Sequence, residues 1–263
     1  MDDNGCKIME LLFFGAGKKG RYWLEYGRGF GIEPKGIIDN DRTLCGSLCE
    51  NIRIYHPDNL NELSFEYIFI TCNREQEIYQ QLLELGVEKS KIISGAHGIA
   101  NHFLFGLVQN VIAPNNVIKQ DDAPSIKKVL FDLQHGMVLG GVEAWVYSQA
   151  KVLKERGLQG LYLAADEAGP AVADTTFPVQ MLRCRELGKE KDKILLCLEK
   201  IAENLPCTIV CNFPQSIFWA ACIAKRLYPK QVRMIAVQHS DEQIYYETYS
   251  LWQGYIDKCL VIS

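Results

Sequence analysis

The sequence lacks several features that would place it in a broad class at once. No apolar run approaches the roughly 20 residues that a membrane-spanning helix needs, so we expect no transmembrane segment. The acidic start, MDDNGCK, is followed by only a short apolar run at 11–14, which is unlike a secretory signal. The net charge of −4 excludes the basic field of a general nucleic-acid-binding protein. We therefore expect a cytoplasmic protein that does not bind nucleic acid.

The sequence also lacks any Cys-x-x-Cys pair, although it contains 10 cysteines. The closest spacings are Cys45/Cys49 and Cys207/Cys211. Most of the cysteines lie in apolar segments, where a thiol behaves as a small hydrophobic side chain. We therefore expect reduced thiols, and neither a disulfide framework nor a metal site.

The composition is that of a globular chain with room for two domains. It has 263 residues, of which 48% are hydrophobic and 23% are charged. Residues 113–126 combine prolines, asparagines and charges without periodicity, which predicts a linker. The expected domains are therefore 1–112 and 127–263.

The first domain opens with a strand followed by a glycine-rich turn. An apolar run at 9–14 leads into Gly15-Ala16-Gly17-Lys18-Lys19-Gly20, and a second strand at 34–38 ends in Asp39. Both the G-x-G-x-x-G spacing and the acidic residue about 20 positions later match the dinucleotide-binding fingerprint. Gly15, Gly17 and Gly20 are thus predicted to let phosphates approach the backbone, and Asp39 to bind ribose hydroxyls.

Strands and helices continue to alternate along the first domain. This rhythm predicts an α/β fold with a mainly parallel, doubly wound, Rossmann-like sheet. Further strands are expected at 52–55, 67–71 and 91–93, and helices at 76–85 and 97–112.

The second domain repeats the same opening and is predicted to be a second Rossmann-like domain in tandem with the first. A strand at 129–133 is followed by a loop with Gly136, Gly140 and Gly141, and then by a helix. Such a turn exposes backbone N–H groups and the positive end of a helix to an anion. Further strands are expected at 161–165, 179–182, 207–211, 232–237 and 258–262, and helices at 189–204, 214–227 and 245–256.

Residues 8–93 resemble the small Rossmann-like domain found in sugar acyltransferases of surface-polysaccharide pathways. The segments FFGAGKKG and GIIDND match the GAG-x-x-G turn and the G-[FI]-[IL]-D-[ND] strand of those relatives. The resemblance implies a pocket for a nucleotide or a nucleotide-sugar. The alternative, that the glycines serve only the packing of strand against helix, stays open.

Residues 127–263 resemble the N-terminal, acceptor-side half of a two-domain GT-B glycosyltransferase, in particular the retaining family 4. Three segments carry the resemblance: GGVE at the head of the helix, AVQH at the end of a strand, and IDKCLVIS at the close. The resemblance implies a nucleotide-sugar donor, a saccharide acceptor and no required cofactor.

The same resemblance assigns roles to four residues of the second domain. Gly140 and Gly141 would direct N–H groups at phosphate or sugar, and His239 would bind the donor sugar or its phosphate near the reacting centre. Glu143 would contact the substrate, and His239 and Glu143 are the predicted catalytic residues. Two alternatives stay open: Glu143 as a negative charge favoured at a helix N-terminus, and His239 as a histidine satisfied at a strand end.

The resemblance also implies a C-terminal donor-binding domain, which is absent from residues 1–263. We therefore expect this chain to bind donor weakly and to transfer no sugar alone. Two other functions are kept open. One is a nucleotide-binding or nucleotide-sugar-binding regulatory module; the other is an NAD-dependent oxidoreductase, for which we find no hydride acceptor site. Peripheral membrane association and oligomeric state are also left open.

Overall fold

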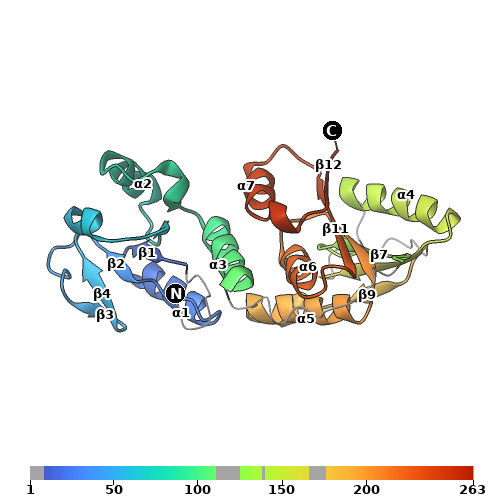
Figure 1. Ribbon diagram of the computed structural model, residues 1–263, viewed down its shortest axis with the longest axis horizontal. Coiled ribbons are helices and arrows are strands. Elements are labelled where there is room, and N and C mark those ends of the chain that lie inside the picture. Colours follow the sequence, from blue (N-terminus) through green and yellow to red (C-terminus); the bar gives the residue numbers. More distant parts are fainter. Residues whose placement is uncertain (1–8, 111–124, 138–139, 166–175, 263) are drawn as a thin grey trace. The chain divides into compact units, whose positions relative to one another are not determined.

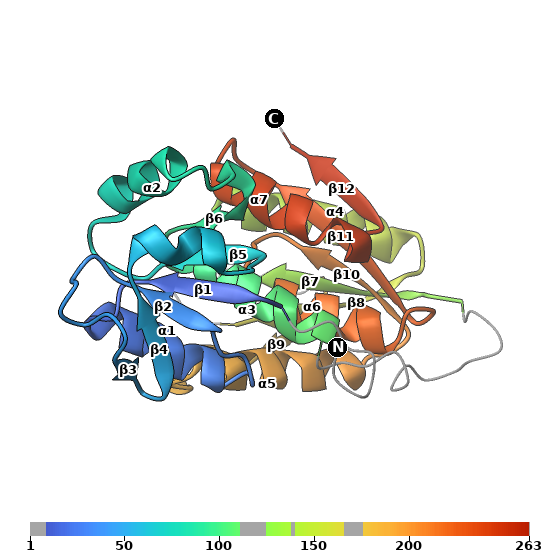
Figure 2. The same cartoon turned by 60° about the vertical axis from the view of Figure 1, so that its left-hand side comes forward.

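The computed structural model describes residues 9–110, 125–137, 140–165 and 176–262, in two compact units, Met1–Val111 and Ile112–Ser263. Each unit contains one six-stranded sheet with helices on both faces (Figures 1 and 2). This confirms the predicted fold class, two doubly wound Rossmann-like α/β domains with mainly parallel sheets. The predicted linker at 113–126 lies almost entirely outside the described residues.

The sheet of the first unit has the strand order β3-β4-β2-β1-β5-β6. All neighbours are parallel except β3 and β4, which form a short antiparallel hairpin at the edge. The strand β3 was not predicted because two residues are too few to show a period. The strands are β1 (Leu11–Phe14), β2 (Gly36–Ile38), β3 (Leu48–Cys49), β4 (Ile52–Tyr55), β5 (Tyr67–Ile70) and β6 (Ile92–Ile93), and the helices are α1 (Lys18–Arg28), α2 (Glu75–Glu84) and α3 (Ala96–Asn110).

Both faces of this first sheet are covered, which explains why its strands are uniformly apolar. Leu12 of β1 lies in a buried cluster with Ile78 and Leu82 of α2. Phe13 points to the opposite face, where its ring meets the ring of Phe103 of α3 edge to face at 6.1 Å. Alternation along β1 thus places successive side chains in two separate cores.

The sheet of the second unit is wholly parallel, in the order β12-β11-β10-β7-β8-β9. Its strands are β7 (Lys128–Leu133), β8 (Gln159–Ala164), β9 (Val179–Met181), β10 (Cys207–Cys211), β11 (Val232–Gln238) and β12 (Lys258–Val261). Its helices are α4 (Gly141–Glu155), α5 (Glu190–Ala202), α6 (Ser216–Leu227) and α7 (Gln243–Leu251).

The core of the second unit is also built on both faces of the sheet. On one face, Phe131 and Tyr162 cluster with Val146 and Tyr147 of α4. On the other, every residue from Ser216 to Ala224 of α6 is buried. Such a completely buried helix segment fits a position between a sheet and a further helix layer.

Two predicted helix boundaries in the second unit were wrong. The helix expected at 214–227 begins at Ser216, so Pro214 precedes it instead of occupying its first turn. The helix expected at 245–256 ends at Leu251 and gives way to the 3-10 turn Gln253–Tyr255. Gly254 lies inside that turn, and glycine is a poor helix former.

Both sheets have a topological switch point, where the chain leaves a central strand in one direction and later returns to its other side. The switch lies between β1 and β5 in the first unit and between β7 and β10 in the second. In open parallel sheets, ligands bind in the crevice at the carboxyl ends of these strands. The two switch points are therefore the places to examine for function.

The first prediction concerns Gly160 of β8. A Cβ atom at this position would lie 2.2 Å from the ring of the buried Phe177. We expect Gly160→Ala to lower the free energy of unfolding by about 1–3 kcal/mol through overpacking. Gly188→Ala is the control, because a Cβ there meets nothing within 4 Å. Equal urea-unfolding midpoints for the two variants would contradict this account of the core.

Candidate functional site

The glycine turn of the first unit connects β1 to α1 at the switch point. Gly15 has φ +121°, a conformation that other residues rarely adopt. A Cβ at Gly20 would lie 2.0 Å from the carbonyl oxygen of Gly15. A Cβ at the exposed Gly17 would meet nothing within 4 Å. The turn itself therefore requires glycine at Gly15 and Gly20. The surface of the turn at Gly17 is open, so a ligand could approach it there.

Asp39 follows β2 and lies directly against this turn. Its Oδ2 accepts a hydrogen bond from the backbone N–H of Ala16 at 2.8 Å, and its Oδ1 accepts one from the N–H of Asp41 at 2.9 Å. The structure therefore brings Asp39 to the glycines, as the fingerprint predicts. A carboxylate has about four acceptor positions, so these two bonds leave capacity for a ligand hydroxyl.

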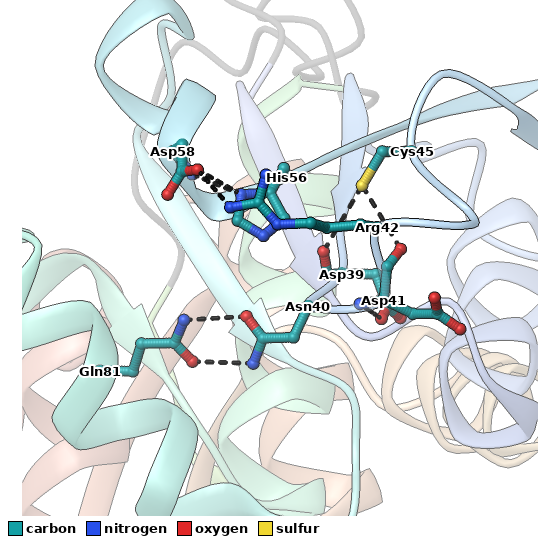
Figure 3. Close-up of polar contacts among 8 residues, drawn as sticks. All are labelled: Asp39, Asn40, Asp41, Arg42, Cys45, His56, Asp58 and Gln81. Atoms are coloured by element: carbon teal, nitrogen blue, oxygen red, sulfur yellow. Dashed lines mark hydrogen bonds and ion pairs between the residues drawn. The ribbon is translucent and has the colours of Figure 1, made fainter.

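The loop after β2 is fixed by polar contacts that were not predicted from the sequence (Figure 3). The amides of Asn40 and Gln81 face each other and exchange two hydrogen bonds of 2.9 Å each. Arg42 donates to Asp58 at 3.1 Å. The sequence did carry a signal for these contacts, because a polar run follows the buried strand. Within that run, a role was predicted only for Asp39.

Lys19, in the GAGKKG run, pairs with an acidic side chain of α2. Its ammonium lies 2.6 Å from Oε1 of Glu75 and 3.1 Å from the carbonyl oxygen of Cys72. This pair joins the N-terminal turn of α1 to that of α2. Lys19 is therefore placed by protein contacts, which leaves backbone N–H groups and the exposed Lys18 to meet an anion at this turn.

The switch point of the second unit carries a buried carboxyl group, Asp132 of β7. Its side chain is wholly buried, and its Oδ2 accepts hydrogen bonds from the backbone N–H groups of Asn212 at 3.1 Å and Phe213 at 3.2 Å. Burial raises the pKa of Asp132 to about 7; these hydrogen bonds oppose the shift, and the negative charge of Glu143 adds to it.

Asn212 connects this carboxyl group to His239. The Nδ2 of Asn212 donates to the backbone carbonyl of Asp132 at 2.7 Å, and its Oδ1 lies 2.9 Å from Nε2 of His239. The ring of His239 also meets the ring of Trp145 edge to face, with centroids 5.4 Å apart. Partial burial lowers the pKa of His239, which favours the neutral ring.

The predicted residues at the head of α4 lie where the motif places them. Gly140 is the N-cap of α4, without a side-chain capping bond, and Glu143 is buried. A Cβ at Gly140 would lie 2.4 Å from Oε2 of Glu143, so the carboxylate folds back over this glycine. A Cβ at Gly141 meets nothing within 4 Å. This geometry fits a carboxylate at the positive end of a helix.

Neither Asp132 nor Asn212 was predicted from the sequence, although each left a signal there. Asp132 is a charged residue inside the apolar strand run 128–133, and Asn212 is a polar residue directly after the apolar strand 207–211. Buried polar residues at strand ends are informative because they cost free energy unless they are bonded. The serine that closes the IDKCLVIS segment, Ser263, lies outside the described residues.

Three further observations bound the chemistry of the described residues. None of their His, Cys, Asp and Glu side chains gather in groups of three or more that could hold a metal ion. All nine described cysteines are free thiols. Within the same residues, no helix combines the length and the hydropathy that crossing a bilayer requires.

Residues 7–93 match the model of a family described as C2185-like, N-terminal. No curated protein matches the chain. A crystal structure of a GsuK mutant aligns with 12% identity and a TM-score of 0.33 over 99% of this chain and 66% of that one. A TM-score this low carries no argument about function.

The second prediction concerns the pH dependence that Asp132 brings. With its pKa raised to about 7, native Asp132 keeps its proton between pH 4 and 7, where the unfolded side chain has lost it. The native state then binds more protons, so the free energy of unfolding falls as pH rises through this window. At about 1.4 kcal/mol per pKa unit, the loss reaches about 4 kcal/mol.

Asp132→Asn mimics the protonated carboxyl group and should remove this pH dependence. Hydrogen exchange of the β7 and β10 amides from pH 4.5 to 8 measures it in the second unit alone. Asp192→Asn, which changes an exposed carboxylate of α5, is the control and should retain the wild-type slope. Identical slopes for Asp132→Asn and wild type would show that Asp132 is ionised throughout.

Proposed function

We propose that this chain takes part in transferring a sugar from a nucleotide-sugar donor to a glycan or lipid-linked acceptor in surface-polysaccharide synthesis. The second unit serves as the acceptor-side half of a retaining GT-B glycosyltransferase. The reaction requires nucleotide-sugar and saccharide acceptor, and no further cofactor. A cytoplasmic location fits this donor class and the free thiols of the chain.

The observation that carries the proposal is the contact between two motifs far apart in sequence. The helix that begins with Gly140-Gly141 supplies Trp145, whose ring lies against the ring of His239 at the end of β11. Glu143 of the same helix acts electrostatically on Asp132, which is joined to His239 through Asn212. The motif residues thus share one edge of one sheet.

This arrangement suits the demands of retaining transfer. The departing diphosphate must be stabilised as its charge develops, and preorganised N–H groups do this at low reorganisation cost. The head of α4 offers such groups beside the open Gly141. His239 lies close by and supplies a polar contact for sugar or acceptor.

A second candidate function is favoured by the first unit. Gly17 is exposed, and a Cβ atom there would meet nothing within 4 Å. It is the N-cap of α1 and makes no side-chain capping hydrogen bond, and Asp39 lies against the same turn. These features support a nucleotide or nucleotide-sugar site in the first unit. In that case the chain is a binding or regulatory module, and catalysis in the second unit is not required.

The third prediction separates these functions by locating the ligand. Amide resonances are followed by NMR while UDP-sugars, GDP-sugars or NAD are added. The proposal predicts saturable shifts at Gly141, Glu143 and His239 with a nucleotide-sugar. Gly141→Val should weaken that binding by about tenfold or more, because its side chain fills the anion position without meeting protein atoms.

Gly17→Val is the matched variant, since a Cβ at Gly17 also meets nothing within 4 Å. It should leave shifts in the second unit intact. Shifts confined to the first unit and lost in Gly17→Val would favour the binding module, and a response to NAD alone would favour an oxidoreductase. Because donor binding by this chain is expected to be weak, the titration is carried to high ligand concentration. No shift at all in the second unit with any nucleotide-sugar would overturn the glycosyltransferase proposal.

A further inference from the structure

A row of two hydrogen bonds ends at His239, and it fixes the proton on the ring as well as the position of the side chain. It runs from the backbone carbonyl of Asp132 to Nδ2 of Asn212, and from Oδ1 of Asn212 to Nε2 of His239. The distances are 2.7 and 2.9 Å, both within the range of ordinary hydrogen bonds. Each link has a direction, which can be assigned from the chemistry of its groups.

The orientation of the Asn212 amide follows from its first partner. A backbone carbonyl oxygen can only accept, so the amide atom that faces Asp132 must be the donor Nδ2. The other amide atom, Oδ1, therefore faces His239 and can only accept. Nε2 of His239 must then carry the proton that forms the second bond.

The backbone around Asn212 is held so firmly that this orientation has little freedom. Oδ2 of Asp132 accepts the N–H groups of both Asn212 and Phe213, and the hydroxyl of Tyr245 donates to the carbonyl of Asn212 at 3.4 Å. Asn212 itself is fully buried. Side chains locked by neighbouring bonds in this way are suited to orient a functional group.

With Nε2 protonated, the second ring nitrogen of His239 determines what the ring can bind. Partial burial lowers the pKa of His239, so near neutral pH the ring is uncharged. A neutral imidazole has one donor nitrogen and one acceptor nitrogen. Nδ1 is then the acceptor, and it can take a hydrogen bond from a hydroxyl group but cannot donate one to a phosphate oxygen.

We propose that Asn212 is a positioning residue that holds His239 in the Nε2–H tautomer, so that Nδ1 accepts from a ligand hydroxyl group. The tautomer follows from the contacts of this chain alone. The assignment of the hydroxyl group to a saccharide rests on the proposed function. His239 therefore recognises the sugar part of a nucleotide-sugar or acceptor, and the diphosphate is left to backbone N–H groups.

Titratable groups surround this row on several elements and must be accounted for in any test. They are Asp132 on β7, Glu143 on α4, and Glu242 and Tyr245 at the start of α7. Burial is the cause of the lowered pKa of His239. The effect of a substitution at Asn212 should therefore be measured at the ring nitrogens of His239 and not through activity.

The fourth prediction is tested by 15N NMR of the histidine ring nitrogens in the full chain between pH 5 and 8. In the wild type, we expect His239 to be in the Nε2–H form at pH 7.5. Asn212→Asp places a carboxylate beside Nε2 and should raise the proton affinity of His239 by about tenfold or more. Asn212→Ala removes the acceptor and should yield a mixture of the two tautomers.

Asn204→Asp is the control, because Asn204 bonds to Lys200 and Lys128 elsewhere in the second unit. It should leave the His239 nitrogens unchanged. An Nδ1–H tautomer in the wild type would overturn the proposal, even if the Asn212 variants fail to fold. So would folded Asn212 variants whose tautomer and proton affinity match the wild type.

The ligand class is tested separately with inorganic phosphate and a methyl glycoside at pH 7.5. We expect the glycoside to shift Nδ1 of His239 and phosphate not to do so. The reverse result would overturn the hydroxyl assignment while leaving the tautomer in place. The tautomer is measured without nucleotide-sugar, so its result does not depend on the glycosyltransferase proposal. That proposal would fail separately, if no nucleotide-sugar shifted the resonances of the second unit.

Discussion

A buried carboxyl group, Asp132, organises the switch point of the second unit. Its Oδ2 accepts the N–H groups of Asn212 and Phe213, and its backbone carbonyl accepts from the Asn212 side chain. One residue of β7 thereby fixes the turn after β10 and the amide that meets His239. The group carries a cost, because burial disfavours its ionised form and raises its pKa to about 7. Local costs of this kind are most often found at functional sites, where a polar arrangement is retained against stability.

The two glycine turns share a structural feature that cannot be read from their sequence motifs. In each, a carboxylate rests against the turn: Asp39 binds the N–H of Ala16, and Glu143 folds over Gly140. Each turn then leaves one glycine open, Gly17 or Gly141. Acidic residues that a fingerprint marks as ligand groups are thus also part of the turn's own structure. Their structural and binding roles are compatible, since a carboxylate oxygen can accept more than one hydrogen bond.

The fold was predictable because each sheet is covered on both faces, so its central strands are short apolar runs separated by helical periods. The glycines and Asp39 were predictable from spacing, since strand, turn and helix place them locally. Asp132 and Asn212 were not, because they meet across 80 positions through the parallel pairing of β7 and β10. The two-residue strand β3 was too short to leave a pattern, whereas its partner β4 was predicted with its observed bounds. Local signals therefore located the turns, and only the tertiary structure supplied the polar row from Asp132 through Asn212 to His239 in the second unit.

The charge of these turns limits what each can do alone. The ammonium of Lys19 is paired with Glu75, and the second turn adjoins the carboxyl groups of Asp132 and Glu143. An anion is thus held mainly by backbone N–H groups at the second turn, and by such groups together with the exposed Lys18 at the first. A helix N-terminus contributes about 0.3–1 kcal/mol, or about 2 kcal/mol when partly buried. Micromolar binding requires about 8 kcal/mol. The turns can orient a diphosphate, but most of the affinity must come from the base, the ribose and the sugar. A neutral His239 that accepts from hydroxyl groups is consistent with that division.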